Sequence, residues 1–232
     1  MKTFKKVLVL AIIAVMVVSL FAGCSGSSGS AVDRIKQSGK LVMHTNAGFP
    51  PYEYLGSDNV PAGVDIDICQ AIADELGVKL EVVDADFDGL IPSLVAGKCD
   101  LVAAGMTVTD ERKQSVDFSV TYASATQYII ALESDDSITC VDDLADKVVG
   151  VQLGTTGDIY MSDEGMAKEI KEYKNALEAG MDLVNGKLDA VVIDKMPAEN
   201  VVAVNDGLKL IGDAFGTEEY AIAVAKGSED LL

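Results

Sequence analysis

Polar residues of complementary chemistry follow several short apolar segments of this 232-residue chain. Arg112 can hold a carboxylate through two parallel hydrogen bonds. Thr107 can donate to the same anion, as can the backbone N–H groups of Thr155 and Thr156, where a helix is expected to begin. Asp194 can accept hydrogen bonds from an ammonium group. Together these residues have the chemistry to bind a small zwitterion.

Two aromatic residues extend this interpretation. Phe49 and Phe87 can enclose the aliphatic part of a small ligand between their rings. Each candidate also has an ordinary structural explanation when it is considered alone: Arg112 as a surface charge, Asp194 as a helix cap and Phe87 as part of the core. The placement of these residues on the predicted elements therefore carries the argument.

Short strands and helices alternate from residue 40 onward. The helix predicted over 65–76 carries Ile68, Ile72 and Leu76 on one stripe and is expected to end at Gly77. Alternation of this kind favours parallel sheets covered by helices, an α/β architecture, in which ligands bind beyond the carboxyl ends of the strands. Strands are predicted over 41–44, 80–83, 100–104, 128–132, 148–152, 170–173 and 188–193, and further helices over 89–96, 110–116 and 175–184.

One short pattern occurs twice. A helix, a glycine stop, an aspartate and a buried strand recur around Gly97-Lys98-Cys99-Asp100 and Gly186-Lys187-Leu188-Asp189. The repetition suggests a plan of two lobes, although the usual turns of α/β proteins would also produce it.

Seven segments follow one another in a characteristic order: 49–54 (FPPYEY), 63–68 (GVDIDI), 86–92 (DFDGLIP), 105–112 (GMTVTDER), 118–122 (FSVTY), 149–155 (VGVQLGT) and 188–194 (LDAVVID). In this order they resemble the polar amino-acid-binding family of ABC importers, the bacterial extracellular solute-binding proteins of family 3. The resemblance extends over nearly all of residues 33–232. No single segment is specific, but their order is.

The resemblance implies a periplasmic-binding-protein-like fold with two α/β lobes joined by a hinge of two segments. The two crossings are expected near 122–126 and 216–220, so that 32–121 plus 221–232 form lobe 1 and 122–220 form lobe 2. The implied function is capture of a free amino acid outside the membrane and delivery to the membrane subunits of an ABC importer. A protein of this kind is not an enzyme, needs no cofactor and is expected to be a monomer.

The resemblance also assigns roles by position. Arg112 takes the place of the carboxylate-binding arginine, helped by the three threonines already named. Asp194, the Gly105 carbonyl and the Thr107 hydroxyl are the expected ammonium acceptors, and the two phenylalanines stack on the ligand. The complete set of expected ligand-binding residues is Asn46, Phe49, Phe87, Gly105, Met106, Thr107, Arg112, Gln152, Thr155, Thr156 and Asp194.

The chain departs from the family at two places. Several members that bind basic side chains carry an acid where this chain has Asn46, and an amide both donates and accepts, so we expect a neutral polar ligand to be preferred. The family also usually continues beyond the segment Ala225–Glu229 with a long helix, whereas this sequence stops at Leu232. The sequence is therefore expected to be a fragment, or lobe 1 to lack its closing helix.

The N-terminal residues are expected to be a targeting signal. Lys2, Lys5 and Lys6 precede an apolar run from 7 to 21, which is too short for a membrane-spanning helix. The following Phe21-Ala22-Gly23-Cys24 resembles a lipobox, in which the cysteine is acylated. We therefore expect a signal peptide over 1–23, a lipid on Cys24 that anchors the protein on the outer face of the membrane or in the periplasm, and a flexible Ser/Gly tether over 24–31.

Composition and cysteine usage limit the other classes of function. A formal net charge of −19 makes nucleic acid a poor partner. Cys69 is expected to be a small buried hydrophobe, Cys99 and Cys140 could pair, and a single histidine, His44, makes a zinc site improbable. Two alternatives remain open from the sequence: an enzyme on the same scaffold, such as a small-acid dehydratase, and the sensor domain of a receptor.

Overall fold

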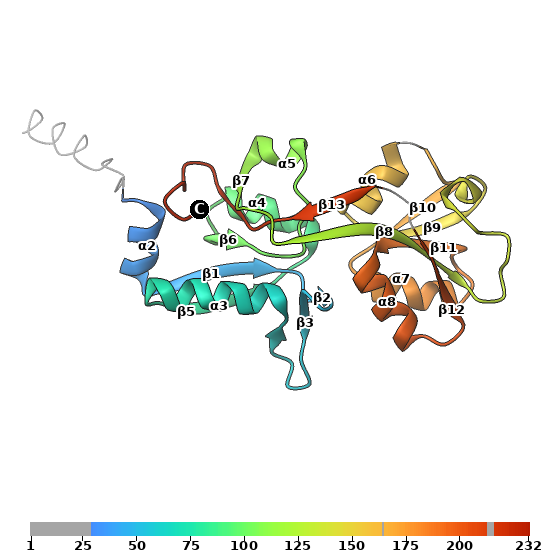
Figure 1. Cartoon of the computed structure of the whole chain (residues 1–232), viewed down its shortest axis with the longest axis horizontal. Helices are drawn as coiled ribbons and strands as arrows, with labels where there is room; N and C mark the ends of the chain where they lie inside the picture. Colours follow the sequence, from blue (N-terminus) through green and yellow to red (C-terminus); the bar gives the residue numbers. More distant parts are fainter. Residues whose placement is uncertain (1–28, 164, 213–215) are drawn as a thin grey trace, which may run out of the picture. The chain divides into compact units, whose positions relative to one another are not determined.

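A computed structural model describes residues 29–163, 165–212 and 216–232 (Figure 1). Residues Ala31–Leu232 form one compact unit by their internal contacts. The predicted signal peptide and the acylated Cys24 lie outside the described residues. No helix of the described part is long and apolar enough to cross a membrane.

The first lobe is built on a five-stranded mixed sheet. β1 pairs in parallel with β5 and β6, and β14 pairs antiparallel with β6 and β7. Its core is formed by buried apolar side chains of the sheet and of the helices against it, among them Leu41, Met43, Leu90 and Leu94. The strands, in order across the sheet, are β5 (Lys79–Asp84), β1 (Lys40–Thr45), β6 (Leu101–Val102), β14 (Ala223–Ala225) and β7 (Val116–Phe118), and the helices are α2 (Ala31–Ser38), α3 (Val64–Leu76), α4 (Leu90–Val95) and α5 (Asp110–Ser115).

The helix α3 shows how local sequence sets an element of this lobe. It ends at Gly77, which has a left-handed φ of 72° and whose N–H donates to the last turn, as the glycine stop predicts. The predicted stripe is only half-buried, because the fully buried line is Asp65, Cys69 and Ala73. The prediction that Cys69 is a buried hydrophobe is confirmed, and Asp65 is a buried acid that the pattern did not indicate.

The second lobe is built on a six-stranded mixed sheet. β9 pairs in parallel with β10 and β11, whereas β8 pairs antiparallel with β11, β12 and β13. The strands are β10 (Glu169–Tyr173), β9 (Val148–Gln152), β11 (Ala190–Asp194), β8 (Ala123–Leu132), β12 (Leu208–Ile211) and β13 (Thr217–Tyr220), and the helices are α6 (Thr156–Asp163), α7 (Ala176–Val184) and α8 (Lys195–Val204). Two apolar clusters, one containing Ile130 and Leu183 and the other Ile129 and Val151, form its core.

Two neighbouring strands carry the chain between the sheets. The chain leaves the first sheet after β7, enters the second through β8 and returns through β13 to β14. β8 and β13 lie side by side in Figure 1, with Ala123 paired to Tyr220 and Thr126 to Thr217. The predicted fold class, two α/β lobes with a two-segment hinge, is confirmed.

Some local predictions differ from the structure. β8 begins at Ala123 rather than at 128, because its first residues pair with β13, which is distant in sequence. Val116, predicted to end a helix, begins strand β7. A small sheet of β2 (Gly48–Phe49), β3 (Glu53–Leu55) and β4 (Pro61–Ala62) was not predicted.

Candidate ligand-binding site

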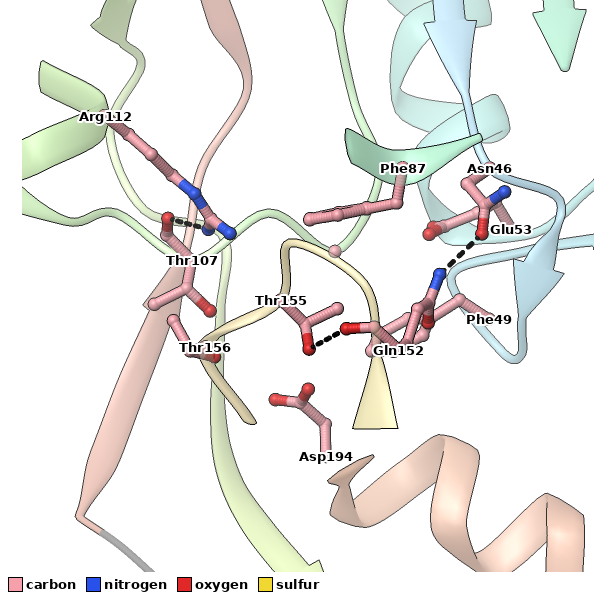
Figure 2. Close-up of a pocket in the computed structure, with 11 residues that line it drawn as sticks. Asn46, Phe49, Glu53, Phe87, Thr107, Arg112, Gln152, Thr155, Thr156 and Asp194 are labelled. Atoms are coloured by element: carbon pink, nitrogen blue, oxygen red, sulfur yellow. Dashed lines mark hydrogen bonds between the residues drawn. The ribbon is translucent and has the colours of Figure 1, made fainter. Parts of the chain in front are cut away.

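Loops from both lobes meet around one cavity with an empty volume of about 280 Å³. Every ligand-binding residue expected from the sequence lines it except Met106, and one residue that was not expected, Glu53, lines it too (Figure 2). The lining consists of Asn46, Phe49, Glu53, Phe87, Gly105, Thr107, Arg112, Gln152, Thr155, Thr156 and Asp194.

Met106 lies between two lining residues in the sequence, but it does not line the cavity itself. Its side chain belongs to the core cluster of the first lobe that also contains Leu90, Leu94 and Val116. The expectation that Met106 lines the site is therefore corrected: its side chain packs in the lobe.

Arg112 enters the cavity from the short helix α5. Thr109 is the N-cap, and its hydroxyl accepts from the Arg112 N–H at 3.1 Å, which fixes the first turn. The guanidinium donates from Nη1 to the Thr107 carbonyl at 2.6 Å and from Nη2 to the Gly154 carbonyl at 2.9 Å. It lies 5.4 Å from the centroid of the Phe87 ring. Burial lowers the Arg112 pKa.

Arg112 is not a surface charge. The residue is only 8% exposed, and within the described residues no carboxylate lies within ion-pair distance of it. A buried cation without a carboxylate partner is costly, and an anionic ligand would relieve that cost.

Asp194 ends strand β11 and is buried in the cavity wall. It occupies the N-cap position of α8, but its side chain makes no capping hydrogen bond, so the interpretation as a helix cap fails. Its Oδ1 accepts from the Tyr220 hydroxyl at 2.7 Å. Burial, with the nearby charge of Glu218, raises the Asp194 pKa to about 7. A carboxylate in this setting gains from a cationic partner.

Thr155 and Thr156, at the start of α6, differ in whether their backbone N–H groups are already hydrogen-bonded. The Thr155 N–H donates to the Gln152 carbonyl at 3.2 Å, and the Thr155 hydroxyl donates to the same carbonyl at 2.8 Å. The Thr156 N–H belongs to the first turn of α6, where N–H groups have no acceptor inside the helix. Of the two backbone donors expected from the sequence, only Thr156 therefore remains available to an anion.

Gly105 lets the backbone pass close to Phe49. Its φ is +49°, and a Cβ on this residue would lie 2.7 Å from Cε1 of Phe49. Its N–H donates to Oδ2 of Asp65 at 2.8 Å, and the same oxygen accepts from the Tyr122 hydroxyl at 2.9 Å. The buried acid in α3 thus holds the loop that contains Gly105.

A bridge of two amides closes another side of the cavity. Gln152 Nε2 donates to Asn46 Oδ1 at 2.9 Å (Figure 2). It also donates to the Lys174 carbonyl at 3.0 Å, and Asn46 Nδ2 donates to the Ala85 carbonyl at 2.8 Å. Gln152 Oε1 is buried, and we find no hydrogen-bond partner for it within the described chain. Gln152 Oε1 is therefore a buried hydrogen-bond acceptor without a donor.

Glu53 lines the cavity although the sequence pattern did not indicate it. It is 0% exposed, and neither carboxylate oxygen accepts a hydrogen bond from an N–H group in the described part of the protein. Burial, together with the neighbouring Asp65 carboxylate, raises the pKa of Glu53 well above its usual range. Glu53 belongs to the segment 49–54, one of the seven that resemble the family. Nothing in the neighbouring residues indicates that an acid in such a short polar segment is buried.

The other candidate groups take no part in the cavity. His44 lies in β1 and is not among the lining residues. Cys69, Cys99 and Cys140 are free thiols. In the ranges that the structure describes, no three His, Cys, Asp or Glu side chains are arranged to hold a metal ion.

Known proteins are similar to this chain in sequence and in fold. The profile of the bacterial extracellular solute-binding proteins, family 3, matches residues 41–231. The L-cystine-binding protein TcyJ of Escherichia coli K12 is 32% identical over 227 residues, which cover 96% of this chain and 85% of TcyJ. The arginine-binding extracellular protein ArtP of Bacillus subtilis is 37% identical over 234 residues, which cover 97% of this chain and 88% of ArtP.

A solved structure of an amino-acid-binding protein has the same fold. The arginine-bound form of ArgBP from T. maritima superimposes with a TM-score of 0.82 at 40% identity, covering 86% of this chain and 94% of ArgBP. These relatives are binding proteins for amino acids, not enzymes, and this chain is likewise a solute-binding protein and not an enzyme. The chain belongs to the bacterial extracellular solute-binding proteins, family 3.

Proposed function

We propose that this protein captures a free polar amino acid between its two lobes and presents it to the membrane subunits of an ABC importer. One observation carries the proposal: Arg112 and Asp194 are both buried in the wall of one cavity, and each lacks a partner of opposite charge among the described residues. An α-amino acid supplies both missing charges at once.

The remaining lining residues complete the proposed site. The ligand carboxylate binds the Arg112 guanidinium and the Thr156 N–H, and its ammonium group binds Asp194, the Gly105 carbonyl and the Thr107 hydroxyl. Phe49 and Phe87 enclose the first carbons of the side chain. The lobes close on the ligand by movement at β8 and β13, with lobe 1 at 32–121 plus 221–232 and lobe 2 at 122–220.

The far end of the side chain meets hydrogen-bond acceptors. Gln152 Oε1 and the Glu53 carboxyl oxygens are buried without donors, so a ligand side chain that carries N–H groups would satisfy them. The relatives named for arginine support a side chain of this kind. Asn46 in place of an acid favours a neutral amide over a cation.

The same proposal places the protein at the membrane. Cys24 carries the lipid, the segment 24–31 is the tether, and the folded unit stands outside the membrane as a monomer. The net charge of −19 favours a partner other than nucleic acid.

Titration calorimetry on the purified chain tests the ligand class. The amino acids are titrated one by one, and the best ligand is compared with its amide and with its N-acetyl derivative, which remove the negative and the positive charge in turn. We expect micromolar or tighter binding of at least one amino acid and loss of binding for both derivatives. Binding of a derivative as tightly as its parent, or heat only from a different class of solute, would contradict the proposal.

A further inference from the structure

Glu218 is a buried acid that lies just outside the cavity lining, on the returning strand β13. It is 5% exposed, whereas its neighbour Glu219 on the same strand is exposed. One of its oxygens, Oε2, accepts from the Thr107 hydroxyl at 2.6 Å and from the Thr156 hydroxyl at 2.8 Å. Thr107 belongs to the first lobe and Thr156 to the second, so one carboxylate oxygen joins a threonine of each lobe.

The proton of each hydroxyl is therefore committed. A hydroxyl carries one hydrogen and two lone pairs, and a carboxylate accepts hydrogen bonds but donates none. Both threonine hydrogens must then point at Glu218. Thr156 uses a lone pair as well, because Gln127 Nε2 donates to its hydroxyl at 3.2 Å. What Thr107 offers the cavity is a lone pair, so its hydroxyl can accept from a ligand but not donate to one.

This count separates two roles that the sequence left open for Thr107. As a donor it would have helped Arg112 to bind the carboxylate, and as an acceptor it would bind the ammonium. We propose that Glu218 is a positioning residue that fixes the Thr107 hydroxyl as an acceptor and thereby sets which end of the amino acid faces Thr107. The inference rests on the proposed function, since it concerns the orientation of the ligand in that site.

A purely structural role explains Glu218 less well. Its contacts are hydroxyl and amide groups, including the Tyr160 hydroxyl, and it forms no ion pair within the described part of the chain. The Glu218 charge acts to raise the Arg112 pKa, but the two groups form no ion pair in the described residues, and burying a carboxylate without a paired cation costs stability. An uncharged residue of the same shape would serve packing as well, so the charge indicates a task other than holding the fold.

The test compares Glu218→Gln with Glu219→Gln, which makes the same change of charge one residue further on the exposed face of β13. Both full-length variants and the wild type are titrated with the best amino acid and with the matching α-hydroxy acid, whose hydroxyl can donate or accept. An amide at 218 presents a donor as well as an acceptor, so the Thr107 proton is no longer committed. We expect the amino acid to lose at least about tenfold in affinity, the size of one hydrogen bond to a charged group. The hydroxy acid should change by less than about threefold.

Two further variants, Thr107→Val and the double variant, test the role of Glu218 by other means. Thr107→Val removes the acceptor and leaves Glu218 in place, and it should show the same selective loss for the amino acid even where Glu218→Gln does not fold. In the double variant the two losses should not add, since both act through one hydroxyl. Wild-type protein that binds no amino acid would refute the proposed function. Wild-type binding with equal losses for both ligands, or with Glu218→Gln matching Glu219→Gln, would overturn the role of Glu218 alone.

Discussion

The Arg112 guanidinium and the Asp194 carboxylate line the same cavity and are both more than nine-tenths buried, yet in the described structure they do not form an ion pair with each other. Arg112 is held by two carbonyl groups and Asp194 by a tyrosine hydroxyl. Two opposite charges kept apart in one cavity form a site for a ligand that carries both charges.

Replacing Arg112 should abolish most of the affinity for the ligand. Removing one partner of a buried charge pair costs about 2–5 kcal/mol, because the other charge is left unpaired. Arg112→Ala should therefore weaken binding about thirtyfold or more, and Arg112→Lys should also weaken it, since an ammonium group cannot form the bidentate pair. Calorimetry with Lys113→Ala, the exposed neighbour on α5, as the control measures this. Binding by a folded Arg112→Ala protein within about threefold of wild type would exclude the site.

Ligand affinity should rise with pH between 6 and 8. The Asp194 pKa in the ligand-free protein is raised to about 7, and an ammonium group at the site favours the ionised form and lowers that pKa. Ligand binding therefore releases the Asp194 proton below pH 7, whereas above pH 7 the carboxylate is already mostly ionised and little proton release accompanies binding. Affinity should be about tenfold higher at pH 8 than at pH 6, with the change centred near pH 7.

The proton count provides an independent check of this pH dependence. Calorimetry at pH 6.5 in buffers of different ionisation enthalpy should report release of more than about half a proton per ligand. In Asp194→Asn, which binds more weakly, the pH dependence near 7 should disappear. A wild-type affinity that is flat across this range would show that Asp194 is already ionised before the ligand arrives.

Much of the fold could be predicted because its elements are local. The apolar run 148–152 coincides with strand β9, and Gly77 ends α3 as its type requires. The start of β8 at Ala123 could not be predicted, because it depends on pairing with β13, which comes much later in the chain. For the same reason Val116, which pairs with Ala225 of β14, was predicted to lie in a helix.

The site residues could be predicted where they directly follow the carboxyl end of a predicted strand. The burial of Glu53 and Glu218 was not, because acids on short strands are usually exposed and only tertiary packing buries these two. A weak signal existed at Glu218, which lies two residues before the fully buried Tyr220 and therefore on the same face of β13.

Gly105→Ala should weaken binding by displacing Phe49. The new methyl group would lie 2.7 Å from the Phe49 ring, so the ring must leave its place in the cavity wall. Gly97→Ala is the matched control, since Gly97 also has a positive φ of +69° but a Cβ there meets nothing within 4 Å. Both variants should lose about 1–2 kcal/mol of folding stability to backbone strain. Only Gly105→Ala should also lose ligand affinity, by about tenfold or more. Equal affinities in the two variants would show that the contact with Phe49 does not matter for binding.

Cys24→Ala should abolish acylation of the protein and leave its signal peptide uncleaved. If Cys24 carries lipid, the wild-type protein partitions with membranes in cell fractionation, and the variant is neither acylated nor cleaved before residue 24. Cys140→Ala, which alters an exposed thiol in the second lobe, is the control and should leave acylation and cleavage unchanged. Mass spectrometry of the mature N-terminus measures both features. An unmodified N-terminus at another residue would remove the lipid anchor.

Selectivity among side chains should follow the acceptors at the far end of the cavity. Glutamine and glutamate have the same shape, but only glutamine has N–H groups for Gln152 Oε1 and Glu53, and glutamate would place a third carboxyl group beside buried acids. Glutamine should therefore bind at least about a hundredfold more tightly than glutamate, since a buried polar group without a partner costs about 1–3 kcal/mol and more when charged. Asn46→Asp adds a carboxylate at the same end and should shift the preference from glutamine toward arginine and lysine. Competition calorimetry on wild type and Asn46→Asp measures both ratios. A wild-type protein that prefers glutamate, or a variant whose ratio of arginine to glutamine affinity does not rise, would show that the ligand side chain does not reach Asn46 and Gln152.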